Sequence, residues 1–163
     1  MVLGIDPGKD GAGVLLGHDL DVLLTWRTRD LLVPAGKGGK QLYSPVAMLG
    51  QVMAAREHGC RLAMLERAQP RPGEGGMSSY TSGEGRGIWL GLLVACGFEV
   101  REPHPATVAA TMLRDLPGEG KARAVFLAEQ HPGLELRRGR ERKPHEGVAD
   151  AYVLARYGRG EGR

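Results

Sequence analysis

Four acidic side chains are spaced so that they could act together on one substrate. Asp6 closes an apolar run and precedes a tight turn, and Glu66 closes a second apolar run. Asp150 lies in an amphipathic C-terminal segment, with Glu146 one helical turn earlier. Carboxylates at the ends of buried strands are held in position, and hard divalent cations bind convergent carboxylate oxygens. The pattern predicts a metal site built from three distant parts of the chain.

Such a set of carboxylates suits hydrolysis at phosphorus. Two cations about 3.5–4 Å apart can activate a water and stabilise the leaving 3′-oxygen of an in-line displacement. We expect Asp6 to bridge both ions, and Glu66 and Asp150 each to complete one coordination shell. The competing interpretation makes each acid structural: a turn cap, the start of a polar loop, and half of a surface ion pair.

The elements that must position these acids follow from apolar spacing. Turn residues separate three expected antiparallel strands and two later ones, at 2–6, 12–17, 21–29, 62–66 and 98–102. Helical spacing predicts helices at 45–58, 87–96, 106–114, 121–130 and 145–157, with Ser44 capping the first and Gly59 ending it. The order predicts an α/β fold, a mixed five-stranded sheet flanked by helices. The first strand would lie beside the fourth, so Asp6 and Glu66 would be neighbours.

Composition bounds the class of protein. For 163 residues we expect one domain over 1–158 and a short polar tail at 159–163. No run reaches the roughly 18 apolar residues of a membrane span and no secretory leader is visible, so we expect a soluble, cytoplasmic protein. Cys60 and Cys96 are expected to be reduced core thiols. The net charge of +3 permits a polyanionic partner without requiring one.

The acids and their flanking segments resemble the RNase H-like nuclease superfamily, and within it RuvC-type Holliday-junction resolvases, particularly phage-encoded ones. The matching segments are GIDPG at 4–8 with Gly11, LE at 65–66, 77–79, 87–93, PHPA at 103–106 and ADAY at 149–152. The resemblance implies a homodimeric endonuclease that binds a four-way DNA junction and nicks two opposed strands. It also implies two Mg²⁺ or Mn²⁺ ions in each active site. A helicase or branch-migration partner is left open.

The last helix departs from the cellular resolvase pattern, in which an acidic or histidine ligand lies three residues before the aspartate. That position is Gly147 here. Glu146, four residues before Asp150, lies on the same helical face and is the preferred fourth ligand. His145 is the alternative, as a general acid or base, or as a helix cap or phosphate contact.

Two segments are expected to contact DNA. The loop at 137–143 carries five basic residues against one acid, and it would flank the cleaved phosphate. The glycine-rich segment 67–86 is expected to be a flexible loop that presses Met77 or Tyr80 between bases at the junction centre. The candidate DNA-binding residues are Arg67, Gln69, Arg71, Met77, Tyr80, Arg86, Arg137, Arg138, Arg140, Arg142 and Lys143. An apolar helix at 88–96 is expected to supply the dimer contact.

Other functions compete with junction cleavage. Another RNase H-like nuclease, cutting RNA in hybrids or acting as a 3′-exonuclease, would use the same acids. A non-catalytic DNA-junction-binding protein would be expected to lack one acid, and here the three central ones are present. GIDPG also resembles the phosphate loop of sugar-kinase and actin-like ATPases, which need two such domains.

Overall fold

The short apolar runs pair into one mixed sheet in the computed structural model, which describes residues 1–67 and 75–160. Its strand order is β3-β2-β1-β6-β7. The strands are β1 (Val2–Asp6), β2 (Ala12–Leu16), β3 (Val22–Arg27), β6 (Leu62–Leu65) and β7 (Glu99–Arg101). β1 pairs antiparallel with β2 and parallel with β6, and β2 pairs antiparallel with β3. The expected α/β fold is confirmed, with the first strand beside the fourth.

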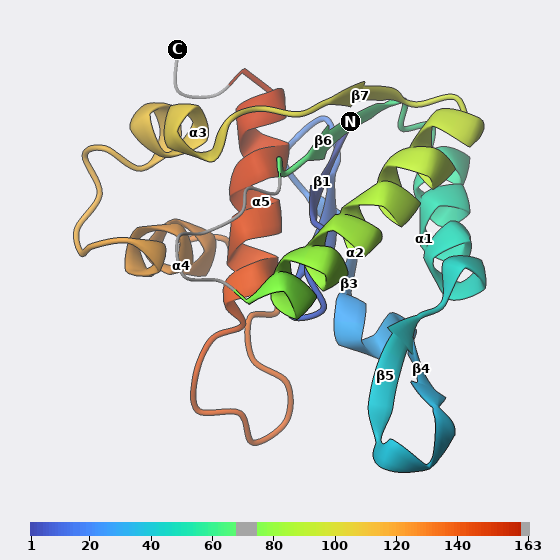
Figure 1. Cartoon of the computed structure of the whole chain (residues 1–163). Coiled ribbons are helices and arrows are strands. Elements are labelled where there is room, and N and C mark those ends of the chain that lie inside the picture. Colours follow the sequence, from blue (N-terminus) through green and yellow to red (C-terminus); the bar gives the residue numbers. More distant parts are fainter. Residues whose placement is uncertain (68–74, 161–163) are drawn as a thin grey trace.

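Helices cover both faces of this sheet because its strands are apolar on both sides. Leu3, Ile5 and Leu15 face α1 (Pro45–Glu57) and α2 (Gly76–Ala95). Val2 and Val14 face the other layer, formed by α3 (Pro105–Met112), α4 (Lys121–Glu129) and α5 (Glu146–Gly158) (Figure 1). Within the described ranges, none of these helices combines the length and the apolar character needed to cross a membrane.

The cap and the end of the first helix, and the free state of the two cysteines, agree with the predictions. The backbone N–H of Ala47 donates to the Ser44 hydroxyl over 3.3 Å, so Ser44 caps α1. Gly59 follows the helix at a φ of +87°, a conformation that glycine adopts without strain. Cys60 is buried, Cys96 is partly buried, and both are free thiols.

The helix α2 corrects one expectation. It begins at Gly76 rather than Gly87, so residues 76–86 are helical where a flexible loop was predicted. Several glycines in this stretch lower its helix propensity, which is why the pattern resembled a loop. Packing outweighs propensity here. A Cβ on Gly85 would lie 2.5 Å from the Tyr43 hydroxyl and 2.6 Å from the Pro7 carbonyl oxygen, so glycine allows the helix to approach closely.

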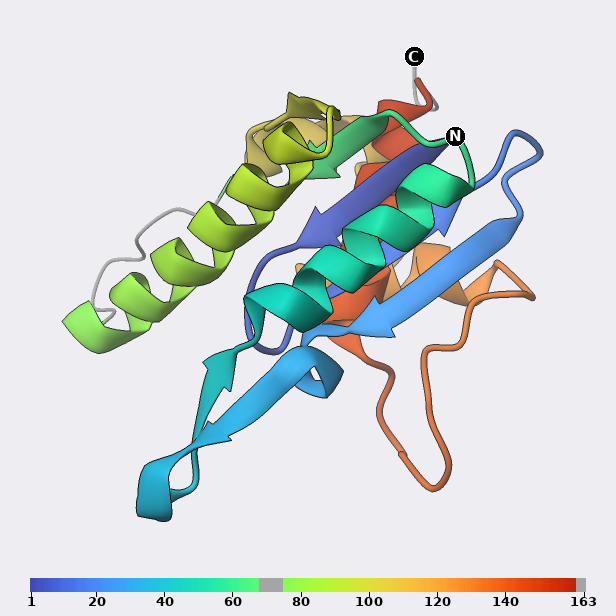
Figure 2. The same cartoon turned by 90° about the vertical axis from the view of Figure 1, so that its right-hand side faces the viewer.

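A β-hairpin between β3 and α1 was not predicted. The short 3₁₀ helix η1 (Thr28–Leu31) ends the extended run, and β4 (Leu32–Ala35) then pairs antiparallel with β5 (Lys40–Tyr43). The turn between them contains η2 (Gly36–Gly38) and reverses through Gly36 and Gly39 at φ of +67° and +68°. The hairpin projects away from the sheet (Figure 2).

Candidate active site

The ends of β1 and β6 bring two of the predicted acids together. Asp6 is the last residue of β1, and Glu66 directly follows β6. The two strands are parallel neighbours, and the Glu66 backbone N–H donates to the Ile5 carbonyl oxygen over 2.9 Å. The prediction that Asp6 and Glu66 lie side by side at one end of the sheet is confirmed.

Helix α5 brings the third acid to the same place. A Cβ on Gly4 would lie 2.1 Å from the Ala151 carbonyl oxygen, so the helix backbone rests directly on β1 at this glycine. Asp150 precedes Ala151, and Asp6 lies two residues beyond Gly4. This contact places the Asp150 carboxylate close enough to act electrostatically on Asp6.

Asp6 has an unusual electrostatic environment for a carboxylate. Burial and the negative charge of Asp150 raise its pKa to about 6. The backbone N–H of Gly8 donates to Asp6 Oδ1 over 3.2 Å and partly offsets these effects. A partly buried acid beside a second acid favours a bound cation, because the positive charge would offset the effects of burial and of Asp150.

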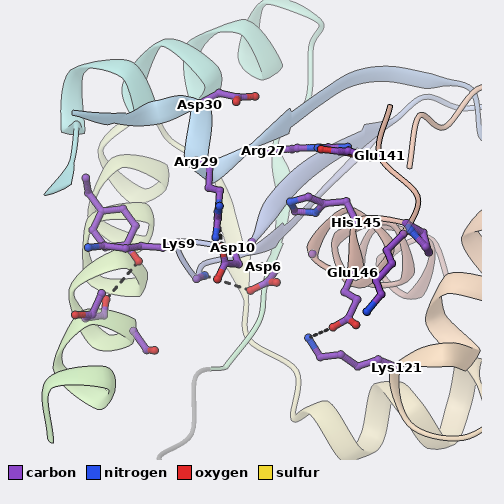
Figure 3. Close-up of a pocket in the computed structure, with 18 of the residues that line it drawn as sticks. Asp6, Lys9, Asp10, Arg27, Arg29, Asp30, Lys121, Glu141, His145 and Glu146 are labelled. Carbon is purple, nitrogen blue, oxygen red and sulfur yellow. Dashed lines mark hydrogen bonds and ion pairs between the residues drawn. The ribbon is translucent and has the colours of Figure 1, made fainter. Parts of the chain in front are cut away.

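A cavity of about 890 Å³, lined in part by Asp6, opens beside the strand ends (Figure 3). Asp6, His145 and Glu146 line it together with Met77 and Lys143, all of them predicted site residues. Glu66 and Asp150 are not part of its lining. Side chains that the sequence did not single out also contribute, among them Lys9, Asp10, Arg27, Arg29, Tyr43, Lys121 and Glu141.

Lys121 is the functional candidate that sequence reasoning missed. It is the first residue of α4, and its ammonium lies 3.1 Å from Glu146 Oε2 and 3.5 Å from Asp150 Oδ2. Burial lowers the pKa of Lys121, but the carboxylates of Asp150 and Glu146 outweigh burial and raise it. No sequence signal pointed to Lys121, because only the packing of α4 against α5 brings it to these acids.

The donor set fits a hard divalent cation in its chemistry. Asp6, Glu66, Glu146 and Asp150 offer only carboxylate oxygens, and the Lys121 ammonium shows that Glu146 and Asp150 already share a cation. Within residues 1–67 and 75–160, no three side chains of His, Cys, Asp or Glu are grouped closely enough to hold a metal ion as they stand. Metal binding would therefore require the carboxylates to close in.

His145 is the N-cap of α5. Its Nδ1 accepts the backbone N–H of Val148 over 3.2 Å, as a capping side chain does. Burial and the guanidinium of Arg27 lower the pKa of His145, which favours the neutral ring. With Nδ1 engaged as an acceptor, the proton of a neutral ring resides on Nε2. This tautomer can donate a hydrogen bond through Nε2 but offers no lone pair there to a metal.

The candidate DNA-binding residues differ in whether an acid partners them and in how exposed they are. Arg137 bonds Glu129 over 2.6 Å, Arg138 bonds Asp30 over 2.5 Å and Arg86 bonds Glu102 over 2.8 Å. Arg137 is exposed in spite of its partner, and the other exposed side chains are those of Arg67, Met77, Tyr80, Arg140, Arg142 and Lys143. Met77 and Tyr80 lie on the first turns of α2 and are 73% and 67% exposed. Gln69 and Arg71 lie outside the described residues.

Comparison with known proteins identifies the fold. No protein-family model and no curated protein matches the sequence. Among solved structures, Thermus thermophilus RuvC in complex with a Holliday junction substrate matches with a TM-score of 0.63 at 14% identity. A second structure of Thermus thermophilus RuvC matches with a TM-score of 0.57 at 17% identity. Each match covers 99% of this chain and 96% of the other. The chain therefore has the RuvC-like, RNase H-like fold expected from its motifs.

Proposed function

We propose that this chain is a metal-dependent endodeoxyribonuclease that resolves four-way DNA junctions by paired phosphodiester hydrolysis. The observation that carries the proposal is the position of Asp6. It is a partly buried carboxylate at the end of the central strand, beside Glu66 and close to Asp150 of α5. The same fold occurs in Thermus thermophilus RuvC, solved with a Holliday junction substrate.

The residues divide the chemistry between them. Asp6, Glu66, Glu146 and Asp150 would hold Mg²⁺ or Mn²⁺, two ions in each active site. When bound, such ions supply an activated water and stabilise charge on the leaving oxygen. In the metal-free protein the Lys121 ammonium would neutralise Glu146 and Asp150, and metal ions would take its place. His145 Nε2–H is available at the cavity to hydrogen-bond a phosphate oxygen.

Two exposed regions supply DNA contacts in this proposal. Arg140, Arg142 and Lys143 lie on the loop before α5 and would bind phosphates without reading sequence. Met77 and Tyr80 project from the start of α2, where they would enter the junction centre as wedges from a helix rather than from a flexible loop. Residues 1–158 would act as one nuclease domain.

The enzyme would act as a homodimer, because two symmetric nicks need two active sites related by a two-fold axis. The exposed face of α2 suits this contact. Gly83, Gly87 and Gly91 follow one another at helical spacing, and among the residues that the structure describes a Cβ on each would meet nothing within 4 Å. Val94, one turn further, is 60% exposed. Glycines on one helical face allow two helices to approach closely, so a second copy of α2 fits this face.

The proposal is tested by incubating the protein with a labelled four-way junction, a matched duplex, a fork and an RNA–DNA hybrid, each with Mg²⁺ or Mn²⁺. We expect paired, symmetric nicks in the junction alone. Cleavage of the hybrid, or digestion from 3′ ends, would assign the chain to another RNase H-like activity. Junction binding without cleavage in either metal would indicate a non-catalytic binding protein.

A further inference from the structure

The loop that carries the exposed basic residues is closed at its base. The backbone N–H of His145 donates to the Leu136 carbonyl oxygen over 2.8 Å, which joins the start of α5 to the beginning of the loop. Leu136 is buried in the core, whereas residues 139–143 are exposed. The loop thus leaves and re-enters the molecule at one point, and it projects beyond the sheet (Figure 1).

A buried arginine holds the inside of this loop. Arg27, the last residue of β3, is almost fully buried, and its guanidinium forms a bidentate salt bridge with Glu141. Nη1 donates to Oε1 over 2.6 Å and Nη2 donates to Oε2 over 2.9 Å. Arg27 Nη2 also lies 3.4 Å from the Leu136 carbonyl oxygen. Figure 3 shows Arg27 and Glu141 facing each other beside His145.

Glu141 also organises the loop backbone. Its Oε2 accepts the backbone N–H of Arg138 over 2.9 Å, so one carboxylate joins β3 to two parts of the loop. The hydrogen bond from Arg27 and that from the Arg138 backbone lower the pKa of Glu141 to about 2. Glu141 is the one acid among five basic residues at 137–143. Its negative charge by itself opposes DNA binding, so we expect its position to serve another purpose.

We propose that Glu141 is a positioning residue, which fixes the basic loop against β3 so that Arg140, Arg142 and Lys143 meet the DNA backbone in an ordered arrangement. This inference rests on the proposed function, because the loop is taken to bind junction DNA. A pre-ordered loop loses less conformational freedom on binding than a free one, and it therefore binds more tightly.

The direction in which one substitution changes junction affinity distinguishes a positioning role from a simple effect of charge. Glu141→Gln removes a negative charge, which would tighten DNA binding if the loop acted only through its net charge. A glutamine has only one acceptor oxygen, so it cannot accept from both Arg27 nitrogens and from the Arg138 backbone as the carboxylate does, and the anchor would be weakened. We expect junction affinity to fall roughly tenfold, with a shallower dependence on salt. The cleavage rate at saturating enzyme should stay within about threefold of wild type.

Glu99→Gln is the matched control. It breaks the Arg101–Glu99 pair on β7, an exposed pair of 2.7 Å, with the same change in net charge. This variant should bind the junction as tightly as wild type or slightly more tightly. Arg27→Lys is the second test, because an ammonium keeps the charge but cannot form the bidentate salt bridge. It should weaken binding in the same direction as Glu141→Gln.

Loop order is measured without DNA by hydrogen exchange and by limited trypsin digestion. In Glu141→Gln the amides of Arg138 and His145 should exchange faster, and trypsin should cut within 137–143 roughly tenfold faster than in Glu99→Gln. Unchanged exchange in the loop, or junction affinity equal to or above that of Glu99→Gln, would overturn the positioning role. Failure of wild-type protein to bind a junction would contradict the proposed function, while the exchange data would still decide whether Glu141 orders the loop.

Discussion

Gly147 of α5 lies directly against Gly11 of the β1–β2 turn. A Cβ on Gly147 would stand 2.7 Å from the Gly11 Cα and 2.4 Å from the Asp10 carbonyl oxygen. No side chain fits at this position, which lies three residues before Asp150. The contact explains physically why this chain cannot place a fourth ligand there. It also fixes the start of α5 over the turn that follows Asp6.

Gly147→Ala should therefore destabilise the fold. In an open helix, alanine is favoured over glycine by about 1 kcal/mol, but the clash with backbone atoms should reverse the sign and cost roughly 2 kcal/mol or more. Gly50→Ala in α1 is the control and should stabilise the protein slightly, because a Cβ there meets no described atom within 4 Å. Urea unfolding of both variants measures the difference. Equal effects at the two sites would show that the contact is not tight.

Amide substitution of the three central acids should abolish cleavage. Asp6→Asn, Glu66→Gln and Asp150→Asn each remove one charged ligand while leaving the basic loop intact. Junction cleavage should fall roughly a thousandfold or more, which corresponds to about 4 kcal/mol of transition-state stabilisation. Junction binding should persist. Asp19→Asn, an exposed acid in the turn at the opposite end of β2, is the charge-matched control. Wild-type cleavage in any one of the three would remove that residue from the metal site.

Asp6→Asn should also stabilise the metal-free protein in a pH-dependent way. Because the folded-state pKa of Asp6 is raised from 3.8 to about 6, ionised Asp6 costs stability, and the cost develops as the pH rises from about 4 to 6. The difference corresponds to roughly 2 to 3 kcal/mol above pH 6. Thermal unfolding in EDTA should show Asp6→Asn more stable than wild type at pH 8 and equal to it near pH 3. Equal stability at both values would mean that Asp6 is well solvated.

The sheet and its acids were predictable from sequence because they depend on short-range patterns. Short continuous apolar runs ending in Asp6 and Glu66 specify both the strands and their carboxylates. Lys121 and Arg27 could not be found this way. Their roles depend on α4 meeting α5 and on β3 meeting a loop more than a hundred residues later. The early start of α2 was missed because the local glycine content predicts a loop, whereas the tertiary contact at Gly85 that favours the helix cannot be read from the sequence.

The α2 face proposed for dimerisation predicts a specific disruption. Gly87→Leu places a large side chain where the helices would approach. It should convert the dimer to a monomer without unfolding it, because a Cβ at Gly87 meets no atom of the described residues within 4 Å. Gly50→Leu on α1 is the matched control and should leave the dimer intact. Sedimentation velocity at micromolar concentration measures both. Wild-type protein that is monomeric yet still makes paired nicks would contradict the link between dimer and paired cleavage.

The last prediction separates Glu146 from His145. If Glu146 is the fourth ligand, Glu146→Gln should greatly slow cleavage at every pH and be partly rescued by raised Mn²⁺, because an amide oxygen remains a weak ligand. His145→Ala loses the cap of α5 and should cost about 1 kcal/mol of stability, whereas His145→Asn keeps a capping side chain and should not.

His145→Asn is thus the informative variant, because it separates capping from proton transfer. If His145 only caps the helix and contacts phosphate, the asparagine variant should cleave at a rate close to wild type with a similar pH profile. If His145 is the acid or base, the same variant should remain folded and lose most of its activity. The pH–rate profile should then no longer show the ionisation of His145, whose pKa is lowered from the ordinary value of 6.5 by burial and by Arg27. Full activity in Glu146→Gln combined with its loss in His145→Asn would overturn the preference for Glu146.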